Sequence, residues 1–155
     1  MIDITVTIID YQYQEVPAGS GSLPFIIAPG SEVLLTSIFL QVTSASNRIE
    51  VKATIGWEAQ LLIVNIVPKL LFRLRRGGTG APAPIVFQTT DSAFLGTASE
   101  GPWVALDFTT SFQHTETATP AMVGTFQQYA LTVEHIGQNV ATITGPVHID
   151  GIVYL

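Results

Sequence analysis

His148 and Asp150 are the two residues whose types and spacing come closest to a reactive site. They stand two positions apart in a run rich in β-branched residues, so on a strand both side chains would lie on one face. Imidazole and carboxylate groups bind metals, and His114 and His135 come from other expected strands. Metal-binding β-sandwich enzymes carry a His-x-His pair with a further carboxylate and histidine, and His-Ile-Asp departs from that pattern. We therefore expect no metal and no cofactor, and a hydrogen-bonded or subunit-contact role for His148.

Other catalytic arrangements lack the spacing that would identify them. The chain has no cysteine, which excludes thiolate nucleophiles, disulfides and Cys-ligated metals. It has no Gly-x-Ser-x-Gly turn for a serine nucleophile, and its twelve acidic residues will form carboxylate pairs by chance. Trp57, Trp103 and Tyr154 are candidates for a sugar-stacking platform, although Trp57 continues an inward-facing alternation typical of a core residue. We predict that the protein is not an enzyme.

Composition and charge limit the possible partners. The 155-residue chain is 47% hydrophobic and 12% charged, which suits one domain with a single core. Its net charge of -6 argues against a nucleic-acid partner, and no stretch approaches the roughly 18 apolar residues of a membrane span. All six basic residues fall between positions 48 and 76, where we expect strand-face charges or partners for an acidic neighbouring subunit. The N-terminus lacks the pattern of a Sec signal.

The first fifth of the chain divides into a strand and an irregular segment. Residues 2–9 alternate between apolar and polar side chains, which predicts a half-buried strand. Residues 11–32 contain prolines and glycines that disfavour a regular ladder and suit an extended arm or a long surface loop. We therefore predict an N-terminal strand and Pro/Gly-rich arm over residues 1–32 and a β-sandwich over residues 33–155.

The following segments read as short strands separated by turns. Residues 33–42 are apolar on both faces, as expected for an inner strand or a subunit contact, whereas residues 48–57 alternate and have one wet face. A Gly- and Pro-rich stretch at residues 76–84 predicts a flexible link, because it lacks the Lys-Ser/Thr pair of a phosphate loop. The other strand-like runs lie at residues 61–67, 69–75, 85–88, 103–108 and 109–117.

The last stretch, residues 128–155, carries two runs of β-branched and aromatic residues around a Gly-Gln-Asn link. This pattern predicts a long terminal hairpin near the centre of the fold. In total, about eight to ten short strands without a helical period predict an all-β protein, a two-sheet antiparallel jelly-roll sandwich. An immunoglobulin-like topology is the alternative, weakened by the missing Cys-Trp-Cys spacing.

Several segments resemble the small jelly-roll domains of endospore surface proteins of the exosporium and spore coat, which are similar to the C1q and TNF-like fold. The resemblance covers about residues 33–155 and lies in the order of the strands and in their residue composition. The segments that carry it are ATIGW at 53–57, LFRL at 71–74, IVFQTTD at 85–91, TTSF at 109–112, YALTV at 129–133 and ATITGPV at 141–147. It implies a self-associating, non-enzymatic domain, often a trimer, displayed on a spore surface without Sec export.

The first function hypothesis is therefore a structural subunit that self-assembles as a trimer, filament or appendage at a bacterial spore or cell surface. Its expected subunit contacts are Leu23, Phe25, Ile26, Ile27, Leu34, Ile38, Leu40 and His148. The second hypothesis is a module that binds a carbohydrate, receptor or other surface protein through the loops at 76–84 and 89–102. A metal-dependent enzyme using His148 and Asp150 is the third, and a viral capsid or spike jelly roll is also compatible with the fold.

Overall fold

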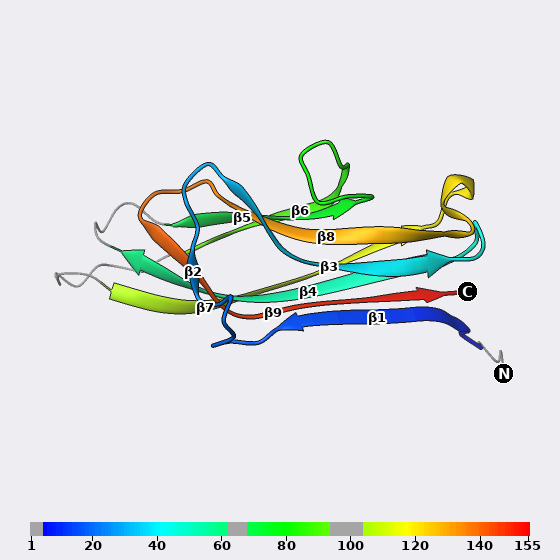
Figure 1. The fold of residues 1–155 in the computed structure, drawn as a ribbon, viewed down its shortest axis with the longest axis horizontal. Coiled ribbons are helices and arrows are strands. Elements are labelled where there is room, and N and C mark those ends of the chain that lie inside the picture. Colours follow the sequence, from blue (N-terminus) through cyan, green and yellow to red (C-terminus); the bar gives the residue numbers. More distant parts are fainter. Residues whose placement is uncertain (1–4, 62–67, 94–103) are drawn as a thin grey trace.

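The computed structural model describes residues 5–61, 68–93 and 104–155, and this part of the chain is built almost entirely from β-strands (Figure 1). No helix among these residues has the length and apolar character needed to cross a membrane. The elements in chain order are β1 (Ile8–Val16), β2 (Phe25–Ile26), β3 (Glu32–Val42), β4 (Arg48–Leu61), β5 (Lys69–Arg76), β6 (Ile85–Ser92), β7 (Val104–Thr117), the 3-10 turn η1 (Pro120–Met122), β8 (Thr125–His135) and β9 (Val140–Tyr154).

The strands form two antiparallel sheets whose order is that of a jelly roll. One sheet has the order β1-β9-β4-β7, with the short β2 also pairing with β9, and the other has the order β3-β8-β5-β6. When β2 is set aside, the partner pairs β1/β9, β3/β8, β4/β7 and β5/β6 alternate between the two sheets along the chain. A long folded hairpin rolled into a two-sheet sandwich gives this alternation. The predicted fold class is confirmed.

The expected terminal hairpin is wrong, because β8 and β9 lie in different sheets. β8 pairs with β3 and β5, whereas β9 pairs with β1, β2 and β4. The turn that joins them therefore crosses from one sheet to the other. Two adjacent strand-like runs do not reveal whether they pair with each other or face each other across a core. Both strands are nevertheless central in their sheets, so the predicted central position is right.

The first described strand lies further along the chain than the alternation at residues 2–9 predicts. Residues 5–7 are outside any strand, and β1 occupies Ile8–Val16, most of which was expected to belong to the irregular arm. Side chains 11–15 are exposed on both faces of this strand, because β1 is an edge strand with β9 on one side only. An edge strand with two wet faces lacks the apolar alternation by which a half-buried strand is recognised.

Three strands run further than their sequence pattern predicts. β4 continues to Leu61, β6 continues through residues 89–92, and the two runs expected at 103–108 and 109–117 are one strand in the described residues, β7. In each case pairing with a neighbour keeps a Thr- or Gln-rich segment extended. The expected strand at 61–67 lies, apart from its first residue, outside the described part of the chain.

The core fills the space between the two sheets. Its largest side chains with under 2% exposure include Trp57, Phe72 and Tyr129, and full burial of such side chains stabilises a fold by about 1.5 to 3 kcal/mol each. Gly151 marks the place where β9 approaches β3 most closely. A Cβ at this position would lie 2.6 Å from the Cδ1 atoms of both Ile38 and Leu40. The missing side chain therefore allows the two sheets to close together on the side of β1 and β3.

Candidate interaction surface

A groove between β1 and β3 is the site that the described residues define best. Its volume is about 330 Å³. Tyr13, Phe39 and Phe126 line it and are 63%, 52% and 64% exposed, respectively. The remaining lining residues are Gln12, Gln14, Ser37 and Ile38. The groove thus combines exposed aromatic rings with uncharged amide and hydroxyl groups, a composition suited to contact with another macromolecule.

The edges of the two sheets hold this groove in place. β1 is the edge strand of its sheet and β3 is the edge strand of the other, on the same side of the sandwich. The backbone N–H of Gln41 donates a hydrogen bond of 2.8 Å to Oδ2 of Asp10, which ties β3 to β1. Beyond this contact, Gln12 and Gln14 face Ser37 and Phe39 across the groove. We call the groove-lining residues together with β1 the β1/β3 edge.

An aromatic row extends this edge onto the outer face of the β1 sheet. Tyr11 and Tyr13 have ring centroids 6.4 Å apart, and Tyr13 and His148 have centroids 6.3 Å apart, with interplanar angles of 28° and 25°. Nε2 of His148 lies 3.7 Å from Oδ2 of Asp150, and Nδ1 lies 4.0 Å from Oε2 of Glu15. His148 is thus a member of a row of flat side chains on an exposed face, with two carboxylates beside it.

The three histidines are not brought together. His114 packs on β7 against Phe87, with centroids 5.9 Å apart, and His135 is buried at the end of β8. Within residues 5–61, 68–93 and 104–155, no three or more His, Cys, Asp or Glu side chains are arranged to hold a metal ion. The candidate pair His148 and Asp150 therefore has no third ligand in the described part of the chain.

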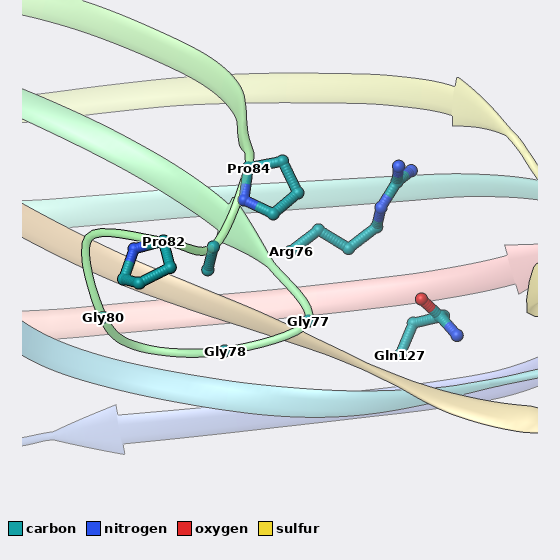
Figure 2. Close-up of a pocket in the computed structure, with 8 residues that line it drawn as sticks. Arg76, Gly77, Gly78, Gly80, Pro82, Pro84 and Gln127 are labelled. Atoms are coloured by element: carbon teal, nitrogen blue, oxygen red, sulfur yellow. The ribbon is translucent and has the colours of Figure 1, made fainter.

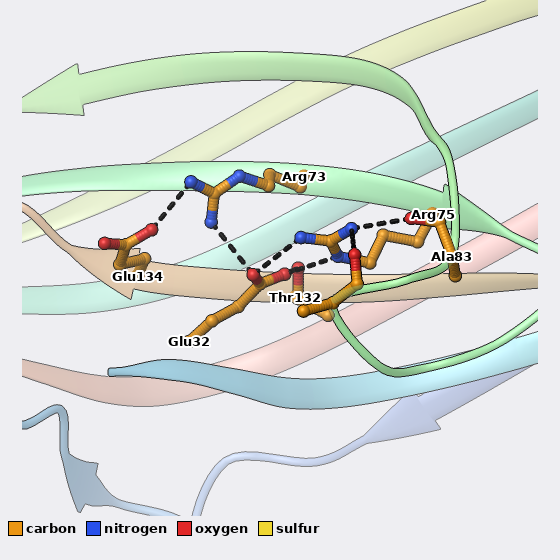
Figure 3. A network of polar contacts seen from close by, with 7 residues as sticks. Glu32, Arg73, Arg75, Ala83, Thr132 and Glu134 are labelled. Atoms are coloured by element: carbon orange, nitrogen blue, oxygen red, sulfur yellow. Dashed lines mark hydrogen bonds and ion pairs between the residues drawn. The ribbon is translucent and has the colours of Figure 1, made fainter. Parts of the chain in front are cut away.

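Arg73 and Arg75 of β5 are committed to contacts within the chain (Figure 3). Arg75 makes a bidentate pair with Glu32, in which Nε and Nη2 each lie 2.7 Å from a carboxylate oxygen. The Thr132 hydroxyl also donates a hydrogen bond to Glu32. Nη1 of Arg73 lies 3.2 Å from Oε2 of the same Glu32 carboxylate. The hydrogen bonds from Arg75, with smaller contributions from Thr132 and Arg73, lower the pKa of Glu32 to about 2, although burial opposes the shift.

The second side of this network orders the Gly- and Pro-rich link. Nη1 of Arg75 donates to the carbonyl oxygens of Ala83 at 2.6 Å and Ala81 at 3.2 Å, and Arg73 pairs with Glu134 at 2.6 Å. The segment at residues 77–84 is therefore a loop tied to the sheet by hydrogen bonds, and its flexibility stays a prediction. Of the two roles expected for the basic residues, strand-face charges or partners for an acidic neighbouring subunit, the second is not needed for Arg73 and Arg75, because acids of the same chain already pair with them.

The same loop surrounds a pocket (Figure 2). The pocket has a volume of about 530 Å³ and is lined by the loop backbone, Arg76 and Gln127. The Arg76 guanidinium pairs with Glu116 at 2.5 Å, and the same carboxylate accepts a 2.6 Å hydrogen bond from the Tyr129 hydroxyl. Burial, aided by Glu116, raises the pKa of Tyr129. The lining therefore offers a ligand no unpaired cation, and the other expected ligand loop, 89–102, is partly strand β6 and otherwise outside the described residues.

The expected subunit-contact residues fall into two groups. Four of them, Leu23, Ile27, Ile38 and Leu40, are buried in the core of their own chain and are unavailable to a second subunit. These apolar side chains pack in the core between the two sheets of their own chain. The others are at least partly exposed, and subunit contact through them stays a prediction: Phe25, Ile26, Leu34 and His148. Trp57 is a core residue as predicted, and Trp103 lies outside the described residues.

Sequence reasoning missed three aromatic residues of the β1/β3 edge, whereas Phe39 lies in the run 33–42 that was expected to be an inner strand or a subunit contact. Tyr11 and Tyr13 lay in the segment interpreted as an irregular arm, and Phe126 lay before the expected hairpin. One signal was available, because the Tyr-Gln-Tyr-Gln run at 11–14 places two tyrosines on one face of any extended strand.

Comparisons with known proteins give a likeness in structure alone. No family model matches the sequence, and no curated protein matches it. A structure of infectious bursal disease virus, Gx strain, aligns with a TM-score of 0.45 at 9% identity and covers 96% of this chain. The VP2 subviral particle of that virus aligns with a TM-score of 0.39 at 9% identity. A structure of its Gt strain aligns with a TM-score of 0.34 at 12% identity, and each alignment covers 96% of this chain.

This chain spans 32%, 40% and 39% of the length of those three chains. A likeness of this degree describes no more than an arrangement of strands. None of these matches tests the resemblance to spore-surface domains, which stays a prediction.

Proposed function

We propose that the chain is a non-enzymatic structural subunit that assembles with copies of itself through the β1/β3 edge. The observation that carries this proposal is the exposure of Tyr13, Phe39 and Phe126 around one groove, each more than half accessible in the single chain. Aromatic rings gathered in this way mark interaction sites, because covering each of them removes a large apolar area from water.

The surroundings of these rings support the same proposal. The other side chains of the groove are amides, a hydroxyl and an isoleucine, and none is charged. The centres of protein interfaces are enriched in aromatic residues and depleted of Lys, Glu and Asp. The groove thus has the composition of an interface centre, and the paired charges of Glu32, Arg73 and Arg75 are not among its lining residues.

Light scattering after size-exclusion chromatography tests this proposal. The wild-type chain is expected to elute at a multiple of its 16.6 kDa mass at micromolar concentration. A double variant, Phe39→Ser with Phe126→Ser, is expected to elute as a monomer. The matched control is Ile85→Ser, which replaces an exposed apolar residue at the opposite edge of the same sheet and should leave the mass unchanged. A monomeric wild-type chain, or an unchanged mass in the double variant, would contradict the proposal.

The setting in which such a subunit assembles is a separate proposal. Localisation at a bacterial spore or cell surface, and assembly as a trimer or appendage, rest on the resemblance to spore-surface domains. A viral capsid or spike subunit is the alternative, since the jelly-roll strand order suits it equally. Electron microscopy of the purified assembly separates the two proposals, because filaments or discrete trimers favour the first and closed shells favour the second.

A surface-binding module is the second candidate function, and the row formed by Tyr11, Tyr13 and His148 favours it. Flat side chains on an exposed sheet, with the polar groups of Asp150 and Glu15 beside them, suit stacking against a sugar ring. Retention on a glycan array should then fall in Tyr11→Ala, which removes one ring of the row. An array without any retained glycan would remove this candidate.

A further inference from the structure

We infer that β1 pairs in antiparallel fashion with β1 of a second copy, about a twofold axis through Gln12. This inference rests on the proposed self-assembly and specifies its geometry. The contact would join two four-stranded paths into one continuous sheet of order β7-β4-β9-β1-β1-β9-β4-β7. A twofold contact gives dimers, or even-numbered assemblies when a second contact is added, so it also separates this geometry from a simple trimer.

The first argument is that β1 is an unprotected edge. It pairs with β9 on one side only, so alternate backbone N–H and C=O groups point outward. Natural sheets protect such edges with Lys, Pro or bulges, yet residues 11–14 of β1 are Tyr-Gln-Tyr-Gln in regular register with β9. Each edge strand has one register irregularity, between Ile8 and Asp10 in β1 and between Leu34 and Thr36 in β3, but β3 also has an N–H covered by Asp10.

The second argument is that β1 is complementary to itself. With Gln12 on the twofold axis, Tyr11 of one copy stands opposite Tyr13 of the other, and this pair occurs twice. Asp10 stands opposite Gln14, also twice, so a carboxylate meets an amide that donates hydrogen bonds. No two like charges face each other in this register. Cross-strand aromatic pairs stabilise a sheet, whereas like charges directly opposite each other destabilise it.

The third argument is that the same axis explains the exposed groove. Gln12 and Phe39 line the groove together, so the groove lies beside the edge of β1 that would pair with the second copy. The grooves of two copies would then face each other behind the paired β1 strands. Phe39 and Phe126, which are both more than half exposed in the single chain, would lie at this contact. Strand pairing and aromatic burial thus belong to one continuous interface.

Single-cysteine variants test the pairing directly, since the chain has no cysteine of its own. Gln12→Cys is expected to form an intersubunit disulfide under mild oxidation, because the two Cα atoms across the axis would be about 4.5 to 5.5 Å apart. Gln14→Cys is the matched control, because its two copies would be offset by four residues, about 13 Å along the strand. A disulfide in the first variant alone supports the pairing; a disulfide in the control alone overturns it.

Two lysine variants test the register of the proposed β1–β1 pairing. Gln12→Lys places two lysines opposite each other and is expected to weaken the dimer by about two- to fivefold. Gln14→Lys makes the same change of side chain but faces Asp10 of the other copy, so it should bind at least as well as wild type. Equal weakening in both variants would overturn the register.

The failures of the two proposals are distinguishable. An oligomer that depends on Phe39 and Phe126 but forms no Gln12→Cys disulfide would overturn β1 pairing and leave self-assembly standing. A wild-type chain that stays monomeric would overturn both.

Discussion

The two lateral sides of the sandwich differ in whether their aromatic side chains are packed within the chain or exposed. On the side formed by β6 and β7, Phe87 stacks against Phe112 with centroids 5.1 Å apart and against His114 at 5.9 Å. On the side formed by β1 and β3, Phe39 and Phe126 remain more than half exposed. Aromatic side chains therefore stabilise the single chain on the β6/β7 side, whereas on the β1/β3 side they remain available for contact with a partner.

Hydrogen bonds follow the same division. On the β6/β7 side, Trp57 Nε1 donates to the Thr110 hydroxyl at 2.9 Å, and that hydroxyl donates to Asp91 at 2.6 Å, which links the core to both edge strands. On the other side, one hydrogen bond from Gln41 to Asp10 joins the edges. β1 and β3 also contact each other, so the two sides differ in their aromatic residues: those of the β6/β7 side, called here the closed side, pack within the chain, and those of the β1/β3 side, the open side, are exposed.

The largest expected effect is on the closed side. Phe87→Ala removes a half-buried ring that contacts two others, and we expect a loss of about 2 to 3 kcal/mol in the free energy of unfolding. Urea denaturation at a protein concentration low enough to keep the chain monomeric measures this loss without interference from association. A loss below about 0.5 kcal/mol would mean that the β6/β7 side is not closed by these rings.

Thr110→Val tests the hydrogen-bond chain on the same side. The valine keeps the shape of threonine but leaves the buried N–H of Trp57 without its acceptor, and we expect a loss of about 2 kcal/mol. The matched control is Thr109→Val, an exposed residue of the same strand, which should change stability by less than about 0.5 kcal/mol. Equal losses in the two variants would contradict a special role for the chain of hydrogen bonds.

Acid should weaken the contact between β3 and β5, because Glu32 at the start of β3 is held by Arg73 and Arg75 of β5. Its folded pKa of about 2 lies below its ordinary value of 4.5, so its stabilising contribution is present above pH 4.5 and is lost as the pH falls toward 2. We expect a loss of about 1 to 2 kcal/mol over this interval, allowing for partial exposure to solvent. Denaturation at several pH values measures it, and Glu32→Gln should flatten the profile. An unchanged slope in that variant would assign the acid sensitivity to other groups.

The smallest expected effect on stability is at the open side. Phe39→Ala should change the free energy of unfolding of the monomer by less than about 0.5 kcal/mol, because the ring is 52% exposed. Comparison with Phe87→Ala under the same conditions uses one substitution at both edges. Similar losses at the two positions would remove the difference between the sides.

The fold class and the inward faces of several strands could be predicted from the order of residues alone. Alternation at residues 48–57 set Trp57 and its neighbours inward, and the absence of a helical period was enough to predict an all-β jelly roll. These features are local, since each depends on side chains two residues apart on one strand. The same local rule explains why the terminal strands were recognised as strands.

The pairing of the strands and the surfaces left open became apparent in the folded chain only. Local alternation is the same whether β8 and β9 form a hairpin or lie in opposite sheets, because partner choice depends on contacts far apart in the chain. Local alternation also does not determine whether an apolar residue is exposed. Leu40 and Phe39 are neighbours in one apolar run, yet the first is fully buried and the second is half exposed, because the second sheet covers only one face of β3.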